Sequence, residues 1–125
     1  MKTRIILIPI LVLCMSIYAI GYSPPTITWE VKTVDLGKIP KSKPATARFS
    51  FENTGNGPLI LTRVKGSCGC TVTEYTKGEI QKGEFGMVTA TYNAAKAGVF
   101  NKTVSVSSNA GETPIILRLK GEVVE

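Results

Sequence analysis

The segment Ser67-Cys68-Gly69-Cys70-Thr71 holds the residues whose types and spacing are best suited to chemistry. A thiolate can attack a disulfide or bind a soft metal ion, and two thiols can close a bridge. One residue separates Cys68 from Cys70, so in an extended backbone both side chains point to the same face. Gly69 between them permits backbone angles that other residues resist. This segment is therefore the candidate site.

The sulfur chemistry of this pair has three interpretations. A bridge between Cys68 and Cys70 would act as a turn lock or, because a small strained ring is easily reduced, as a redox couple. Two thiolates alone would suit Cu(I), whereas zinc needs further ligands, and the carboxylate of Glu74 is too hard to complement them. Alternatively, both residues are small apolar side chains packed in a tight bend. The sequence leaves all three open.

Catalytic groups are scarce in this chain. No histidine occurs among the 125 residues, which removes the commonest general base and excludes Ser-His-Asp and Cys-His arrangements. Glu74, Glu79 and Glu84 stand among glycines and lysines and are interpreted as solvated loop charges rather than an acid/base pair. No glycine loop of the phosphate-binding kind is present. We therefore expect a protein that is not an enzyme and carries no cofactor.

Two further residues have a structural and a functional interpretation. Trp29, the single tryptophan, is expected to pack in the core, with a ligand platform as the alternative. Asn101-Lys102-Thr103 matches the N-glycosylation rule, which short sequences satisfy frequently by chance. Neither residue identifies a function.

The elements that must position the cysteine segment are strands. Apolar and polar residues alternate with a period of two, and the pattern predicts no convincing amphipathic helix. Seven strands are predicted, over residues 27–31, 34–36, 45–52, 59–65, 88–93, 100–106 and 115–123. Glycine, proline and asparagine clusters separate them, most densely over 53–58. This arrangement predicts an all-β fold, an immunoglobulin-like antiparallel β-sandwich of about seven strands.

The beginning of the chain has the pattern of an export signal. Lys2 and Arg4 precede an apolar run from Ile5 to Tyr22, and Ala19-Ile20-Gly21 fits the small-residue rule for cleavage. We expect residues 1–21 to be a signal peptide cleaved after Gly21. The domain would then comprise residues 22–125.

Two alternatives for this leader remain open. The run is long enough to span a bilayer if it is left uncleaved. Lipidation at Cys14 is the other alternative, although Leu13 stands where a small residue is normally needed. All three routes export the domain, which we expect to be periplasmic, at the cell surface or secreted, and attached to a membrane only through this segment.

The charge of the exported part indicates which partners to expect. Without Lys2 and Arg4, thirteen basic and nine acidic residues remain, a net charge of about +4. The lysines are scattered, which is typical of a soluble surface and, alternatively, suits a patch for anionic lipid or polysaccharide. Nucleic acid is not expected, because export separates the domain from it and aromatic residues do not interleave with the cations.

Several motifs in order carry a resemblance to a known family. They are Asp35-Leu36-Gly37-Lys38-Ile39, Phe51 to Leu59, Ser67 to Thr71, Phe100-Asn101-Lys102-Thr103 and Ser108-Asn109. From about Trp29 to Val123 the chain resembles family 1573 among the domains of unknown function, which is similar to Hydin-type immunoglobulin-like domains. The resemblance implies an immunoglobulin-like fold in an exported bacterial protein. It implies no activity, because the family has none assigned.

These observations together predict a non-enzymatic binding or structural module of the bacterial cell envelope. Its partner would be a protein or glycan of the envelope, held at an exposed sheet edge or at the loop from Ser67 to Thr71. The alternative is a redox-active or Cu(I)-binding protein that uses Cys68 and Cys70.

Overall fold

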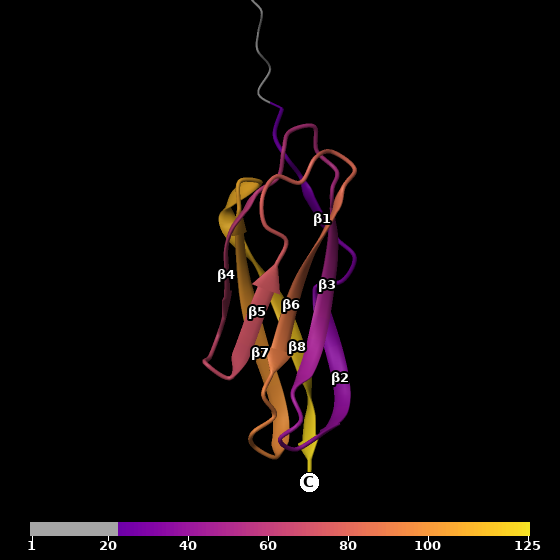
Figure 1. The fold of residues 1–125 in the computed structure, drawn as a ribbon, viewed down its shortest axis with the longest axis vertical. Helices are drawn as coiled ribbons and strands as arrows, with labels where there is room; N and C mark the ends of the chain where they lie inside the picture. Colours follow the sequence, from indigo (N-terminus) through magenta and orange to yellow (C-terminus); the bar gives the residue numbers. More distant parts are fainter. Residues whose placement is uncertain (1–22) are drawn as a thin grey trace, which may run out of the picture.

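Two facing β-sheets make up the part of the chain, residues 23–125, that the computed structural model describes (Figure 1). Eight strands form them: β1 Ile27–Trp29, β2 Thr33–Pro40, β3 Ala45–Asn53, β4 Leu61–Gly66, β5 Thr71–Tyr75, β6 Phe85–Tyr92, β7 Gly98–Ser108 and β8 Gly111–Val124. The all-β prediction is confirmed. The leader predictions, Cys14 included, lie outside the described residues. Within residues 23–125 no helix has the length and apolar character needed to cross a membrane.

The strands divide evenly between the sheets. The first sheet has the order β1-β3-β6-β5 and the second has the order β2-β8-β7-β4. Every pairing between neighbouring strands is antiparallel except that of β2 with β8, which is parallel. The prediction of a purely antiparallel sandwich is therefore wrong at one pair. Its cause is the short link of residues 30–32, which carries the chain from the first sheet to the second without a hairpin reversal.

The sequence pattern missed one strand and misplaced the ends of others. β5 was not predicted, because Thr71 and Thr73 occupy two of its three inward positions while Val72 is 66% exposed, so the apolar alternation is weak. The expected strand over 59–65 begins only at Leu61, since Leu59 forms an isolated bridge with Ile80. The described strands therefore number eight rather than about seven.

The core lies between the two sheets. It is formed by the fully buried inward side chains of four central strands, which are Phe49, Phe51, Val88, Ala90, Val104, Val106, Leu117 and Leu119. Alternation along each strand places these residues on one face and polar residues on the other. Trp29 packs against this core with its ring centroid 4.9 Å from that of Phe51, as expected. Val31, placed in the same strand by the sequence pattern, lies beyond β1 and is 45% exposed.

A buried asparagine closes one end of the sandwich. Asn53, at the end of β3, has no exposed surface. Its Nδ2 donates to the carbonyl oxygens of Gly57 and Ile80, both at 2.8 Å. Its Oδ1 accepts from the backbone N–H groups of Gly55 at 3.0 Å and Thr26 at 3.3 Å. One side chain thus joins the 53–58 turn to the segments before β1 and β6.

Candidate functional site

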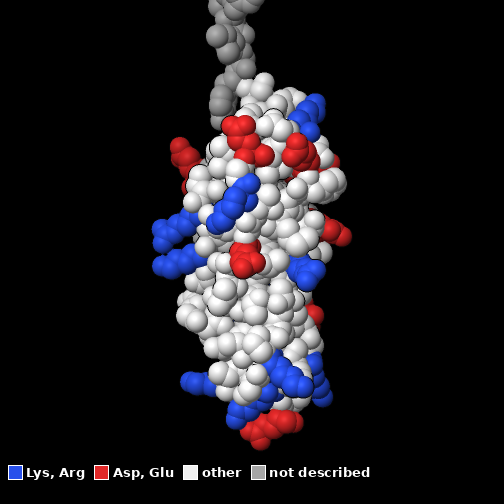
Figure 2. Space-filling model, in the orientation of Figure 1, with Lys and Arg blue, Asp and Glu red and all other residues white. Residues whose placement is uncertain are grey.

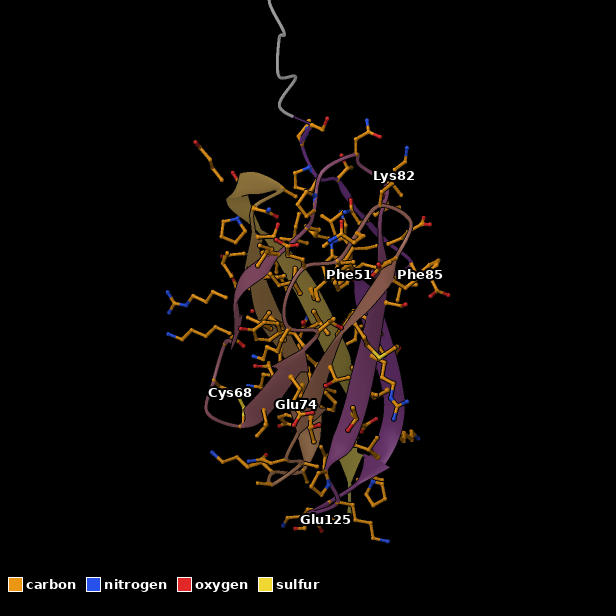
Figure 3. The ribbon with its side chains drawn as sticks, turned by 45° about the horizontal axis from the view of Figure 1, so that its top comes forward. Phe51, Cys68, Glu74, Lys82, Phe85 and Glu125 are labelled. Carbon is orange, nitrogen blue, oxygen red and sulfur yellow. A yellow bond between two sulfur atoms is a disulfide. The ribbon has the colours of Figure 1, made fainter. Side chains whose placement is uncertain are left out.

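The loop from Ser67 to Thr71 connects the two sheets. It leaves β4, an edge strand of the second sheet, and enters β5, an edge strand of the first, at the side of the sandwich (Figures 1 and 3). The backbone turns here instead of continuing as a strand. The sequence-based picture of two cysteines on one face of an extended chain is therefore wrong, although the cysteines still meet.

The structure joins Cys68 and Cys70 in a disulfide, with their Cα atoms 5.2 Å apart (Figure 3). Both residues are partly buried, and Cys70 packs against the core. Among the three interpretations of the pair, the bridge is the one that the structure contains. In this state neither sulfur is a thiolate, so a Cu(I) site at the pair would first require reduction. Residues 23–125 contain no group of three or more His, Cys, Asp or Glu side chains placed to hold a metal ion.

Backbone hydrogen bonds fix the loop at both of its ends. The N–H of Ser67 donates to the carbonyl oxygen of Thr103 at 2.9 Å, and the N–H of Thr103 donates to Ser67 Oγ at 3.2 Å. At the other end the N–H of Asn93 donates to the carbonyl oxygen of Cys70 at 3.0 Å. The loop is thus held to β7 on one side and to the end of β6 on the other.

Thr71 lies beneath the disulfide and is 8% exposed. Its N–H donates to the carbonyl oxygen of Cys68 at 3.3 Å, and its Oγ1 lies 3.8 Å from Cys68 Sγ and 4.0 Å from Cys70 Sγ. The hydroxyl therefore contacts both sulfurs from the inner side. Ser67 and Gly69 are exposed, so the outer side of the loop is made of small polar surface.

Gly69 does not use the backbone freedom that a glycine permits. The described glycines with positive φ are Gly37, Gly78, Gly83 and Gly98, and Gly69 is not one of them. A Cβ atom added at Gly69 would meet nothing within 4 Å. Neither backbone conformation nor space demands a glycine between the two cysteines.

The other residues singled out from the sequence lie away from this loop's chemistry. Glu79 and Glu84 are exposed in loops, as predicted, whereas Glu74 is exposed on β5 and is therefore not a loop residue. Asn101, the potential glycosylation acceptor, is exposed on β7 opposite Lys120. These side chains are not brought together with the cysteines into one constellation.

A hollow of about 380 Å³ lies next to the loop on the outer face of the second sheet. We call it the β4–β7 hollow; the lining side chains that bear charges or hydroxyls are Arg63, Lys65, Ser67, Thr103, Ser105 and Ser107. Sequence reasoning missed it, because its two walls belong to strands about forty residues apart. The polar alternation of β7 was visible in the sequence, but the register that sets it beside the cations of β4 was not.

Fold and loop together define a β-sandwich domain of eight strands with a disulfide-closed connection between its sheets. The chain belongs to the family described as "Protein of unknown function (DUF1573)", whose model matches residues 27–123. The suspected family is thus confirmed. None of the curated proteins compared with the chain matches it.

Solved structures resemble the fold at low sequence identity. A protein of unknown function from Porphyromonas gingivalis W83 matches with a TM-score of 0.70 and 17% identity over 80% of this chain and 47% of its own. The ASH/PapD-like domain 7 of human CEP192 matches with a TM-score of 0.65 and 10% identity over 79% and 85%. The chain thus spans about half the length of the Porphyromonas protein. These likenesses concern the fold alone.

Proposed function

We propose that this protein is an exported, non-enzymatic binding module of the bacterial cell envelope, an immunoglobulin-like sandwich that holds an envelope protein or glycan. The leader pattern and the lack of histidine support export and the absence of catalysis. The observation that carries the proposal is the Ser67–Thr71 loop, an exposed connection that is closed by a disulfide and fixed to both sheets. Rigid scaffolds commonly present their contact residues on loops of this kind.

Rigidity is what makes this loop suitable for binding. A flexible loop loses conformational entropy when a partner orders it, and that loss is subtracted from the affinity. Here the bonds of Ser67 to Thr103 and of Cys70 to Asn93 set the backbone before any partner arrives. The exposed surface of Ser67 and Gly69 is then available for contact at little entropic cost.

Capture from an envelope extract of the host tests this proposal. The protein recovered after export is compared with its Cys68→Ser/Cys70→Ser variant and with Lys82→Ser, a surface control in a distant loop (Figure 3). We expect a specific partner that the control retains and the cysteine variant loses. No partner enriched by any of the three forms would contradict the proposal.

The cysteine variant should remain folded, so that its loss of binding is interpretable. The bridge closes a ring with a single residue between the cysteines, and its loss is expected to cost about 1–2 kcal/mol of unfolding free energy. The core between the sheets supplies most of the stabilisation. Complete loss of folding, seen by circular dichroism, would show that the bridge matters far more than this reasoning allows.

Partial exposure of the disulfide supports a second candidate, a redox protein. Reduction adds two electrons and two protons and yields two thiols, and a thiol reductant must reach one sulfur to begin it. Alkylation and mass spectrometry with and without reductant would count the thiols, and a Cu(I) titration of the reduced protein would test the copper variant of this idea. This candidate would be contradicted if thioredoxin-type reductants fail to reduce the bridge and the reduced cysteines do not bind Cu(I).

Export has its own test. The intact mass of the protein recovered from its host is expected to equal that of residues 22–125. A mass that includes the leader would indicate an anchor, and a lipid-modified mass beginning at Cys14 would indicate a lipoprotein. Recovery of the full-length chain from the cytosol would contradict export altogether.

A further inference from the structure

The β4–β7 hollow combines cations and hydroxyl groups in a regular arrangement. Strand register places Arg63 opposite Ser107 and Lys65 opposite Ser105, so a cation on β4 stands beside a hydroxyl on β7 in two successive rows. Outward residues two apart along a strand are spaced by about 7 Å. In Figure 2 basic side chains project from the edge at which Figure 1 places β4. The cations thus form one rim of the hollow.

Within residues 23–125 the cations and two of the hydroxyls of the hollow have no side-chain partners. Arg63 and Lys65 are both exposed, and neither forms an ion pair with an acidic side chain. The one ion pair found within residues 23–125 joins Lys41 to Glu125. The hydroxyls of Ser105 and Ser107 make no hydrogen bond to any group of the described chain, whereas Ser67 Oγ already accepts from the N–H of Thr103. Two cations and two hydroxyls at the surface are therefore free for a ligand.

The chemistry of these groups favours a ligand that carries both anionic groups and hydroxyls. A guanidinium binds carboxylate or sulfate through two parallel hydrogen bonds, and an ammonium binds either as a point charge. A serine hydroxyl both donates and accepts, which matches the hydroxyl groups of a sugar. No acidic residue lines the hollow, and the domain has a net charge of about +4 that attracts anions.

We propose that the β4–β7 hollow binds an acidic glycan, with carboxylate or sulfate groups at Arg63 and Lys65 and sugar hydroxyls along Ser105 and Ser107. This inference rests on the proposed binding function and names its ligand class. An anionic bilayer is disfavoured, because Pro114 is the main apolar side chain in the lining and a recessed surface does not match a flat lipid plane. Ser67 belongs both to the lining of the hollow and to the Ser67–Thr71 loop, so a glycan bound here would also contact the loop.

Binding to defined polymers tests this inference. Polygalacturonate supplies carboxylates, dextran sulfate supplies sulfates and neutral dextran supplies neither; dissociation constants are measured for the exported protein at low and at physiological salt. We expect both acidic polymers to bind, with affinity falling as salt rises, and neutral dextran not to bind. Whichever acidic polymer binds more tightly identifies the anionic group. No binding to either acidic polymer would overturn the inference.

A pair of charge-matched variants separates the hollow from net charge. Arg63→Gln/Lys65→Gln and Lys32→Gln/Lys43→Gln each remove two positive charges, the second pair from the links before and after β2, the edge strand at the other side of the same sheet. We expect the first variant to lower affinity by about tenfold or more and the second by less than about threefold. Equal losses would show that overall charge alone attracts the polymer and would overturn the assignment of the site. All four side chains are exposed, so both variants should keep the native unfolding midpoint.

The role of Ser105 and Ser107 and the lipid alternative are each tested by a separate measurement. Ser105→Ala/Ser107→Ala should weaken polygalacturonate binding by about three- to tenfold while leaving its salt dependence unchanged; unchanged affinity would overturn the role of the serines. Tight binding to phosphatidylglycerol vesicles that Arg63→Gln/Lys65→Gln abolishes, without polymer binding, would overturn the glycan and assign the face to lipid. If neither acidic polymer binds but the loop still captures a partner from the envelope extract, the acidic-glycan inference is wrong and the proposed binding function is retained.

Discussion

Replacing Asn53 with alanine is expected to destabilise the domain more than any other single polar substitution in its turns. The side chain is fully buried and makes four hydrogen bonds to backbone groups. Truncation at Cβ removes all four bonds at once. The backbone groups of Gly57, Ile80, Gly55 and Thr26 then need other partners.

The size of the effect follows from which groups can find those partners. The carbonyl oxygen of Ile80 still accepts from the N–H of Leu59 at 2.9 Å, and Thr26 is exposed, so its N–H can turn to water. Gly55 and Gly57 are buried, and a buried backbone group without a partner costs about 1–3 kcal/mol. Two such groups together with the lost bonds lower the unfolding free energy by about 3–5 kcal/mol. For a domain of this size that is a large part of the total.

Asn109 provides a matched control. It also bridges a turn, with its Oδ1 accepting from the N–H of Ile60 at 2.9 Å and its Nδ2 donating to the carbonyl oxygen of Pro58 at 2.9 Å, but it is exposed. Water can replace both bonds, so Asn109→Ala should cost less than about 1 kcal/mol. Urea denaturation followed by the fluorescence of Trp29, the single tryptophan, measures both variants.

Asn53→Asp adds a pH dependence to the same test. It keeps the shape but sets a second oxygen against the two carbonyl oxygens that Nδ2 contacts, so burial and repulsion raise the pKa of the introduced carboxyl above its unfolded value of about 3.9. A raised pKa in the folded state favours the protonated form. The unfolding free energy of the variant should therefore be closest to that of the parent protein below about pH 4, and it should fall as the pH rises through the raised pKa.

Two outcomes would refute this reasoning about Asn53. One is a loss for Asn53→Ala as small as that for Asn109→Ala, which would mean that water enters the turn and satisfies its backbone. The other is a difference between Asn53→Asp and the parent that does not grow between pH 4 and pH 7.

Two further pairs of substitutions probe packing by the same denaturation assay. Gly86→Ala should lower the unfolding free energy by about 1–3 kcal/mol, because the new Cβ would overlap the ring of Phe51. Gly69→Ala, with open space around the new Cβ, should change it by less than about 0.5 kcal/mol. Equal losses in the two variants would contradict this packing. Phe49→Ala should cost about 3–5 kcal/mol because its ring is fully buried, whereas Phe85→Ala, at 70% exposure, should change stability by less than about 1 kcal/mol; a large loss at Phe85 would show that its ring packs in solution.

The sequence was most informative where a strand has one apolar and one polar face. Phe49 and Phe51 alternate with polar neighbours, as do Val104 and Val106, and β3 and β7 follow from these patterns alone. β5 was missed because two of its three inward residues are threonines and Val72 faces out, which leaves Tyr75 alone as an inward residue with an apolar ring. Alternation of apolar and polar residues indicates burial, so it does not detect a strand whose inner face is mostly polar.

Strand pairing and loop geometry could not be predicted from the sequence. The parallel partnership of β2 and β8 depends on where the chain changes sheets, which no local pattern states. The cysteine pair was recognisable from residue type and spacing, but the turn that Ser67 and Thr71 enclose depends on bonds to Thr103 and Asn93, many residues away. The β4–β7 hollow required the register of both its strands.

The parallel contact of β2 with β8 has a mechanical consequence. The first described residues and the C-terminus lie at opposite ends of the long axis, and both strands run in the same direction along it (Figure 1). Tension applied between these ends pulls β2 and β8 past each other in shear, so the rungs from Thr33↔Arg118 to Pro40↔Val124 bear the load together. A hairpin pulled from its open end would give way one rung at a time. Stretched along this axis, the domain yields only when several rungs rupture in the same event, and forced unfolding is governed by that barrier.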